Sequence, residues 1–424
     1  MKLMVIGGGG REHAIIKKLR ENPEAEKIYC LPGNGGIAED AECVPIGAKE
    51  IGAIADFAKN HEIGFAVVAQ DDPLALGCVD ALHALGIPCF GPEAKAARIE
   101  SSKVFAKNLM KKYGIPTAAY AVFDDMDAAL RYLDTAPIPT VVKADGLALG
   151  KGVTVAQTRE EAKAAVRAAM GERIFGDSGS RVVIEEYLTG PEVSVLSFTD
   201  GKTLAPMASS MDHKRAHDGD TGPNTGGMGA VAPNPYYTKE LSEMCMETIF
   251  LPTVRAMAAE GCPFKGCLYF GLMLTETGPK VIEYNCRFGD PETQVVLPLL
   301  KTDLLTVMRA CEDGALDKLH VEWSGGAAAC VVLASGGYPT AYEKGKEISI
   351  PPHLPENVTV YHAGDKIERG RLVTSGGRVL GVTAAAATLP EALRDAYAAA
   401  EQISFEGAFM RHDIGKRALE APEG

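Results

Sequence analysis

The chain has 424 residues, 46% of them hydrophobic, and a formal net charge of −13 at pH 7. This length predicts two to four packed domains with substantial cores. The negative charge argues against a nucleic-acid or membrane-surface partner, because both depend on a positive field. The ten cysteines are scattered singly without metal-ligand spacing, which favours reduced thiols in a cytoplasmic protein. No signal peptide or membrane span is expected, since no apolar run reaches about 18 residues.

Residues 1–102 are predicted to form an open α/β domain. Short strand-like runs (LMVI, KIYCL, FAVVA and PCFG) alternate with helical patterns, which is typical of a parallel sheet with crossover helices. The glycines of IGGGGREH do not fit G-x-G-x-x-G, so a dinucleotide site is not expected. They favour a phosphate site at a helix N-terminus, with Gly9, Arg11 and His13 beside it. A tight turn alone would explain the glycines but not the adjacent cations.

Residues 103–324 form the predicted central domain, which opens with the helix in SSKVFAKNLMKKYG. Within it, residues 117–188 are predicted to be a compact β/α insert that contains KADGLALGKGV. This stretch fails the phosphate-loop pattern G-x-x-x-x-G-K-[ST], because the glycine spacing is too short and a glycine replaces the hydroxyl. Lys143, at the end of a strand, and Lys151, in the following turn, could instead meet one phosphate chain.

Two further strands in this domain carry polar residues. In VVIEEYLTGPE, an apolar strand that ends in two acids could pair its backbone with an adenine edge and leave Glu192 for ribose hydroxyls. An edge strand with a solvated acidic end is the alternative. In VIEYNCRFGDPETQ, Glu283 and Asn285 share one strand face, the spacing at which two oxygens can reach one hard cation such as Mg²⁺. Arg287 follows and is available for a carboxylate or phosphoryl group.

The remaining segments complete a multidomain α/β and α+β protein. A long polar loop is predicted at 211–235, a helix near 238–260, and a β-hairpin whose turn lies at 276–278. From residue 325 to residue 424 the pattern changes to strands followed by a final helix. A separate, strand-rich C-terminal domain is therefore predicted at 325–424.

In chain order, these segments resemble the ATP-grasp superfamily and, within it, the phosphoribosylamine–glycine ligase family. The resemblance covers nearly the whole chain, and RFGDPETQ is highly specific to that family. Other matching segments are GGGGREHA, PGNGG, VVKADGLALGKGV, IFGDSGSRVVIEEYLTGPE, DHKRAHDGDTGPNTGGMGA and GGRVLGVTA. The resemblance implies an ATP-grasp core placed between the N-terminal and C-terminal domains, with the insert at about 117–188 as a mobile lid.

The resemblance also implies roles for particular residues. The ATP contacts would be Lys103, Lys143, Glu185, Glu186, Leu188 and Glu192. The ligands of Mg²⁺, or of Mn²⁺, would be Glu283 and Asn285. Glycine and the sugar phosphate would be bound by Gly9, Arg11, His13, Asn34, Asp212, Lys214, Asn224, Gly226 and Arg287. Catalysis would involve Arg287, Lys143 and Asp212.

The implied reaction joins glycine to 5-phosphoribosylamine through glycyl phosphate, and gives glycinamide ribonucleotide, ADP and phosphate in purine biosynthesis. ATP is needed because oxide is a very poor leaving group, whereas phosphate leaves readily. Positioning and charge neutralisation would supply the catalysis, without a protein nucleophile. The partners would be these small molecules, not a nucleic acid or a membrane, and the chain is expected to be a cytoplasmic monomer or weak oligomer.

The sequence departs from the family at a few positions. Ala-Gln-Asp at 69–71 replaces Gly-Pro-Glu, Pro191 replaces an acid, and the strand GLML lacks a metal-binding carboxylate found in many ATP-grasp enzymes. Two alternatives stay open. A different ligase or carboxylase of the same fold should lack DHKRAHDGDTGPNTGGMG together with RFGDPETQ. A nucleotide-binding regulator without catalysis should have lost one of the three polar residues Glu283, Asn285 and Arg287.

Overall fold

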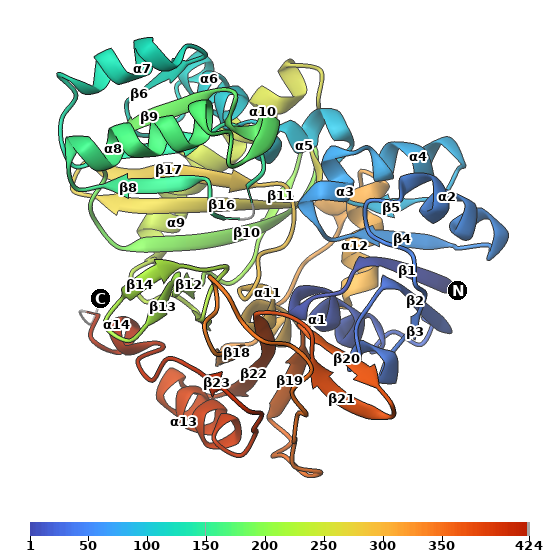
Figure 1. Ribbon diagram of the computed structural model, residues 1–424. Helices are drawn as coiled ribbons and strands as arrows, with labels where there is room; N and C mark the ends of the chain where they lie inside the picture. The colour runs from blue at the N-terminus through green and yellow to red at the C-terminus, as the bar shows by residue number, and fades with distance from the viewer. Residues whose placement is uncertain (149, 422–424) are drawn as a thin grey trace.

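The computed structural model describes residues 1–148 and 150–421, and Figure 1 shows their path from the blue N-terminus to the red C-terminal helices. Leu149, within the lysine-bearing stretch, lies outside the described residues, as do residues 422–424 of the predicted C-terminal domain. Among the described residues, no helix is both long and apolar enough to cross a membrane.

The N-terminal unit is an open, fully parallel sheet with strand order β3-β2-β1-β4-β5, which confirms the predicted architecture. Its strands are β1 (Lys2–Gly7), β2 (Lys27–Pro32), β3 (Glu42–Cys43), β4 (Phe65–Val68) and β5 (Cys89–Phe90). All four residues of β4 are buried, as expected for a parallel strand that is covered on both faces. The connecting helices include α1 (Gly10–Leu19), α2 (Ile51–Asn60), α3 (Asp71–Ala75), α4 (Cys78–Ala84) and α5 (Ala94–Ser101).

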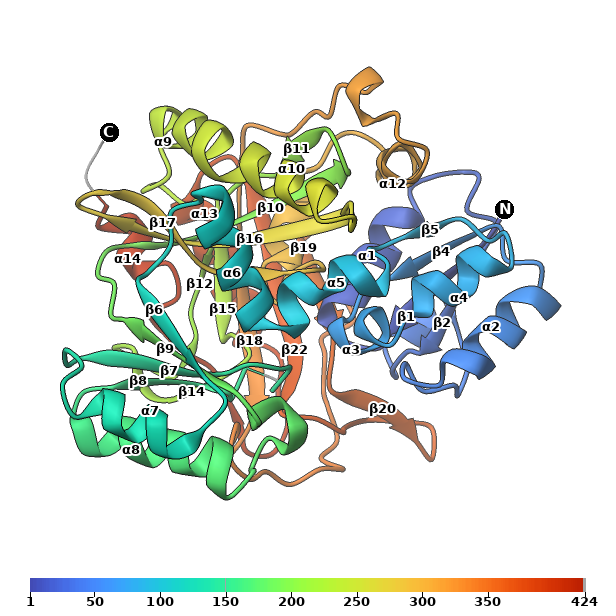
Figure 2. The same cartoon turned by 90° about the horizontal axis from the view of Figure 1, so that it is seen from above.

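The lid is a separate four-stranded antiparallel sheet with strand order β6-β9-β7-β8. Its strands are β6 (Tyr120–Phe123), β7 (Thr140–Ala144), β8 (Val153–Ala156) and β9 (Val182–Glu186), with helices α7 (Met126–Leu133) and α8 (Arg159–Val166). In Figure 2 the lid stands apart from the N-terminal unit. Its buried side chains form a hydrophobic cluster of their own, which includes Leu133, Val142 and Ile184.

A second antiparallel sheet forms the other half of the grasp, with strand order β11-β10-β16-β17. Its strands are β10 (Glu192–Asp200), β11 (Leu204–Pro206), β16 (Lys265–Thr275) and β17 (Gly278–Asn285). The predicted hairpin is confirmed, because β16 and β17 pair antiparallel around residues 276–277. The helices of this unit are α6 (Lys103–Tyr113), α9 (Lys239–Cys245), α10 (Leu251–Ala259), α11 (Thr293–Val296) and α12 (Leu304–Glu312). Helix α6 stops at Gly114, whose φ of 67° lies in the left-handed region that glycine tolerates.

The C-terminal sheet follows the path β12-β15-β18-β22-β19, with β23 (Ala408–Phe409) beside β18. Its longer strands are β18 (Ala327–Ser335), β19 (Val358–His362) and β22 (Arg378–Ala386), and helix α13 (Leu389–Ala400) packs on them. The shorter strands β12 (Met211–Asp212) and β15 (Gly229–Ala232) come from the segment predicted to be a long loop. That prediction was wrong, since 211–232 also contains the hairpin of β13 (Arg215–His217) and β14 (Thr221–Asn224). The glycines and Pro223 of this segment favour a loop in the sequence pattern. Strand β15 nevertheless forms, because it pairs with the distant strand β18.

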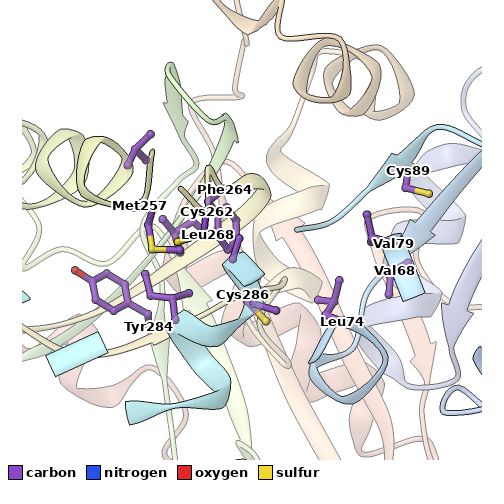
Figure 3. Close-up of a cluster of buried hydrophobic side chains, with 14 of the residues drawn as sticks. Val68, Leu74, Val79, Cys89, Met257, Cys262, Phe264, Leu268, Tyr284 and Cys286 are labelled. Atoms are coloured by element: carbon purple, nitrogen blue, oxygen red, sulfur yellow. The ribbon is translucent and has the colours of Figure 1, made fainter. Parts of the chain in front are cut away.

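The N-terminal unit and the central sheet share one hydrophobic core. Figure 3 shows Leu74 and Val79 of the N-terminal unit on one side of this cluster, with Phe264, Leu268 and Tyr284 of the central unit on the other. All five side chains are at most 3% exposed. The lid cluster is separate from this shared core, so the lid packs as a distinct body against a larger, continuous one.

Candidate active site

A cavity of about 530 Å³ lies where the lid, the central sheet and the two terminal units meet. It gathers side chains from segments that are far apart in the sequence. The sequence-predicted residues that line it are Arg11, Lys103, Lys143, Lys151, Glu185, Asp212, Lys214, Asn224, Gly226, Glu283, Asn285 and Arg287. The predicted residues outside the lining are Gly9, His13, Asn34, Glu186, Leu188 and Glu192.

Lys103 is placed at one end of this cavity by the start of helix α6. The Ser102 hydroxyl caps the helix by accepting from the Phe105 N–H at 3.1 Å. Asp145, just after strand β7, accepts from the Ser102 hydroxyl at 2.9 Å and so ties the helix to the lid. The Lys103 ammonium donates to the Gly146 carbonyl at 3.0 Å. Burial and the nearby Lys143 lower the pKa of Lys103, as expected for a cation held among other cations without its anion.

Lys143 and Lys107 lie on either side of Glu185. The Lys143 ammonium is 3.1 Å from Glu185 Oε1 and donates to the Ile282 carbonyl at 2.8 Å. The Lys107 ammonium is 3.1 Å from Glu185 Oε2. Burial lowers the pKa of Lys107 to about 8, although Glu185 opposes the shift. Glu185 is 3% exposed and β9 lies between β6 and β7, which contradicts the alternative of an edge strand, whereas Glu186 at the end of the strand is exposed.

The other predicted nucleotide contacts lie at the end of β9, in the turn after it and at the start of β10. Glu186 accepts from the Ala119 N–H at 3.0 Å and is exposed, while Leu188 is half-buried. Glu192 lies 3.4 Å from the Lys214 ammonium. These residues lie next to the cavity in sequence, but the structure does not bring their side chains into its lining.

The strand β17 carries the predicted metal ligands and Arg287 follows it. Lys214 is 3.4 Å from Glu283 Oε1 and, together with Lys143, lowers the pKa of Glu283 to about 2 against the effect of burial. Asn285 Oδ1 accepts from Arg287 Nη1 at 3.3 Å. The Nη2 atom of Arg287 is 2.8 Å from Glu100 Oε1, and its buried Nε has no partner in the described part of the chain. Arg287 is thus fixed beside the two oxygen donors.

Strand β12 and the residues after it bring Asp212 and Lys214 to the cavity. Burial and the neighbouring Glu292 raise the pKa of Asp212 well above its usual range, so this carboxyl favours its protonated form. Glu192 and Glu283 raise the pKa of Lys214 well above its usual range. Asp212 and Lys214, two residues apart in the sequence, therefore bring to one cavity a carboxyl that favours its protonated form and a lysine that favours its charged form.

The N-terminal glycine loop contributes one side chain, Arg11, to the cavity. The Gly9 N–H donates to Glu12 Oε2 at 2.6 Å, so a carboxylate of the helix itself already occupies this helix N-terminus. Asn34 uses its amide nitrogen for three backbone carbonyls, including that of Gly8 at 3.1 Å and that of His362 at 2.9 Å. The structure therefore assigns Gly9 and Asn34 to the local fold and does not bring them to the cavity.

His13 points away from the cavity toward the C-terminal unit. Its Nδ1 accepts from the His362 N–H at 2.8 Å, and its Nε2 is 2.9 Å from Asp40 Oδ2. The side chain is 1% exposed, and burial lowers its pKa from 6.5 to about 4. Both ring nitrogens bond to the protein itself and His13 does not line the cavity, so its predicted contact with the sugar phosphate stays a prediction without support from this geometry.

Several cavity residues were not predicted from the sequence. They are Asp71, Glu100, Lys107, Tyr269, Asp290, Glu292, Tyr338, Tyr342 and Arg378. Lys107 could have been found, because it follows Lys103 by four residues and so shares its helix face. Arg378 carries no such local signal, since it reaches the cavity only through the packing of the C-terminal sheet.

A lid sheet and an antiparallel sheet that enclose a lysine-lined cavity define an ATP-grasp protein. Family models for phosphoribosylglycinamide synthetase match the chain at residues 1–100 (N domain), 101–293 (ATP-grasp domain) and 328–417 (C domain). The chain belongs to the phosphoribosylamine–glycine ligase family, also described as phosphoribosylglycinamide synthetases.

Full-length relatives agree with this assignment. A phosphoribosylamine–glycine ligase of Caldanaerobacter subterraneus is 48% identical over 414 residues, which are 98% of this chain and 99% of that protein. One from Rhizobium meliloti is 49% identical over 419 residues, which are 99% of each chain. The crystal structure of the Thermotoga maritima enzyme matches with a TM-score of 0.85 at 36% identity and covers 98% of this chain and 100% of that one. A biotin carboxylase of Campylobacter jejuni shares the fold, with a TM-score of 0.76 at 15% identity over 100% of this chain and 95% of that one.

Proposed function

We propose that the chain uses ATP to join glycine to 5-phosphoribosylamine, with glycinamide ribonucleotide, ADP and phosphate as products. The observation that supports this most is that one cavity collects Lys103, Lys143, Glu283 and the loop that carries Asp212 and Lys214. Lys103 comes from helix α6, Lys143 from the lid sheet and Glu283 from the central sheet. Asp212 and Lys214 come from strand β12 and the residues after it. The names of the full-length relatives point to the same reaction.

The reaction divides into two displacements that need little covalent help from the protein. A carboxylate oxygen of glycine attacks the γ-phosphorus of ATP, and the bond from phosphorus to the ADP oxygen breaks. The amine nitrogen of phosphoribosylamine then attacks the acyl carbon, phosphate leaves, and the nitrogen gives up a proton. Lys103 and Lys143 would hold the phosphate oxygens, since buried ammonium groups favour an anion that restores their charge balance.

A divalent cation fits the residues at the end of strand β17. Glu283 is kept ionised and shares the cavity with Asn285, and carboxylate and amide oxygens are the donors that Mg²⁺ prefers. Among the described residues, no three His, Cys, Asp or Glu side chains form a group able to hold a metal. Glu283 and Asn285 would therefore hold Mg²⁺, or Mn²⁺, together with phosphate oxygens and water. When bound, the cation neutralises charge on the transferring phosphates.

The lid would exclude water from the intermediate. Glycyl phosphate and phosphoribosylamine both hydrolyse, so a site that closes over them protects the reaction. The separate hydrophobic cluster of the lid supports movement as one body. Asp145 and Ser102 would form part of the connection about which it moves.

Measurement of ADP release from a panel of substrates tests the proposed reaction. Phosphoribosylamine is formed in solution from ribose 5-phosphate and ammonia, and glycine, alanine or bicarbonate is added with ATP and Mg²⁺. We expect sustained ADP release only with glycine and phosphoribosylamine together, and formation of glycinamide ribonucleotide in equal amount. Equal ADP release with alanine would contradict the glycine assignment, and equal release with bicarbonate would favour a carboxylase instead.

A further inference from the structure

Arg378, from the C-terminal unit, places its guanidinium group at the end of the cavity opposite Glu185. Two ion pairs lie between these two ends. The first ion pair joins Glu185 and Lys143, and the second joins Glu283 and Lys214. Beyond them, Asp212 lies beside Gly227, whose carbonyl accepts from Arg378 at 3.5 Å. The proposed phosphate contacts of ATP therefore lie at one end and Arg378 at the other.

The position of Arg378 depends on an irregularity in its sheet. Leu333 pairs with Leu380 and Ala334 pairs with Arg378, so Val379 is an extra residue in β22 opposite β18. Such a β-bulge turns the neighbouring side chain away from the regular alternation of a strand, and bulges are frequent beside active sites. Gly226 permits the close approach that results, because a Cβ at this position would lie 2.9 Å from Arg378 Cζ.

The guanidinium group of Arg378 is only partly used by the protein. Its Nη1 donates to the Gly226 and Asp290 carbonyls, both at 2.9 Å, and lies 3.3 Å from Asp290 Oδ1. The Nε and Nη2 atoms of Arg378 have no hydrogen-bond or ion-pair partner within residues 1–148 and 150–421. A planar guanidinium with two free N–H directions is suited to bidentate binding of a phosphate.

Two neighbours complete an anion site at this end. The Tyr338 hydroxyl accepts from the Gly226 N–H at 3.0 Å, which leaves its own proton to donate to a ligand. Arg11 also lines the cavity, and its Nη1 donates to the Phe288 carbonyl at 3.1 Å. Both arginines act on Asp290, whose pKa they lower against the effect of burial.

We propose that Arg378, with Tyr338 and Arg11, binds the 5′-phosphate of the sugar substrate and thereby selects phosphorylated over unphosphorylated sugars. This inference rests on the proposed function, because it assigns one part of that substrate. The same end of the cavity holds the backbone of Gly226 and Gly227, so a bound phosphate would fix the sugar beside Asp212. Arg378 would be a specificity-determining residue, and the C-terminal unit would be needed for sugar recognition rather than for ATP binding.

The reverse reaction offers a test with stable ligands. Glycinamide ribonucleotide, ADP and phosphate are supplied with Mg²⁺, formation of ATP is measured, and the assay is repeated with glycinamide riboside, which lacks the 5′-phosphate. We expect Arg378→Gln to lower kcat/KM for the ribonucleotide about 30-fold, as for a lost charged hydrogen bond, and to change that for the riboside less than about threefold. Arg378→Lys should lie between the two, because it keeps the charge but not the planar fork.

Control variants separate recognition from folding. Arg371→Gln removes an exposed arginine of β21 (Arg371–Thr374) that pairs with Glu347, and should leave both ligands unaffected. If Arg378→Gln does not fold, Tyr338→Phe carries the test, with an expected loss of about fivefold for the ribonucleotide alone. Equal losses for ribonucleotide and riboside would overturn the inference, since a structural role or a glycine contact predicts that result. Absence of ATP formation by the wild-type chain would instead contradict the proposed function.

Discussion

The lysine end of the cavity and the N-terminal glycine loop both look like phosphate sites in the sequence, yet the structure uses them differently. At the lysine end, Lys103 and Lys143 face a cavity and keep donors available for a ligand. In the glycine loop, the Gly9 N–H at the helix N-terminus already donates to the Glu12 carboxylate, and His13 bonds to the C-terminal unit. A helix N-terminus indicates an anion, but that anion can be a side chain of the same helix.

The two regions also differ in what surrounds them. Lys143 belongs to the lid sheet and donates to the Ile282 carbonyl of the central sheet, and the cavity lined by both sheets leaves space for a ligand. The glycine loop is packed closely by other segments, because a Cβ at Gly8 would lie 2.4 Å from the Gly33 carbonyl oxygen and one at Gly10 would lie 2.6 Å from Gln294 Nε2. Only Arg11, which follows the glycines, extends past this packing to reach the cavity.

The largest effect is expected at Glu283, which lines the same cavity as Lys103 and Lys143. Glu283→Gln preserves size but removes the charge that would neutralise the cation, so turnover should fall about 10²- to 10³-fold. The apparent affinity for Mg²⁺, measured as rate against Mg²⁺ concentration, should fall in parallel. Glu276→Gln, in the exposed turn of the same hairpin, is the matched control and should behave as wild type. Normal turnover of Glu283→Gln at limiting Mg²⁺ would remove this residue from the metal site.

A smaller effect is expected for Lys143→Met, which keeps the apolar stem of the side chain. Glu185 retains Lys107 as a partner, so the protein should fold. The value of kcat/KM for ATP should fall about 10²-fold, because one cation against the phosphates is lost. Lys163→Met, on the outer face of the lid beside Asp134, is the control. Unchanged ATP dependence in the Lys143 variant would show that this lysine only supports Glu185.

The smallest effect concerns His13 and tests the structural role of the glycine loop. Its pKa is about 4 in the folded protein and 6.5 when unfolded, so the unfolded state takes up the proton first as the pH falls. The contribution of neutral His13 to the free energy of unfolding is complete above pH 6.5 and is lost as the pH falls toward 4. At pH 5 the loss is about 2 kcal/mol. Urea unfolding of His13→Asn at pH 8 and pH 5 should show a correspondingly smaller pH dependence, with the KM for phosphoribosylamine nearly unchanged.

The exposed His353→Asn serves as the matched control for that experiment. It should retain the full pH dependence of the wild type, because it leaves His13 and its contacts unchanged. His213 also has its pKa lowered to about 4 by burial, and it remains in both variants, so its contribution cancels. A large rise in the KM for the sugar in His13→Asn, without loss of stability, would return His13 to the substrate site.

Local sequence patterns predicted those parts of the molecule that depend on local rules. The parallel strands, helix α6 with its glycine stop, and the β16–β17 hairpin follow from periodicity and turn residues. Glu283 and Asn285 were found because alternate residues of a strand share a face. Strands β12 and β15 and the position of Arg378 could not be predicted in this way, since each depends on pairing with the distant strands β18 or β22.

The separate hydrophobic cluster of the lid has a consequence for how the protein would come apart. Its small core, around Leu133, Val142 and Ile184, has fewer apolar neighbours to lose than the core shared by the N-terminal and central units. Sub-global unfolding should therefore begin in the lid, whose amides would exchange hydrogen sooner than those of β1 and β16. A bound nucleotide that bridges Lys143 of the lid and Lys103 of the body would couple these two cooperative units, and would turn a local opening into one that requires release of the ligand.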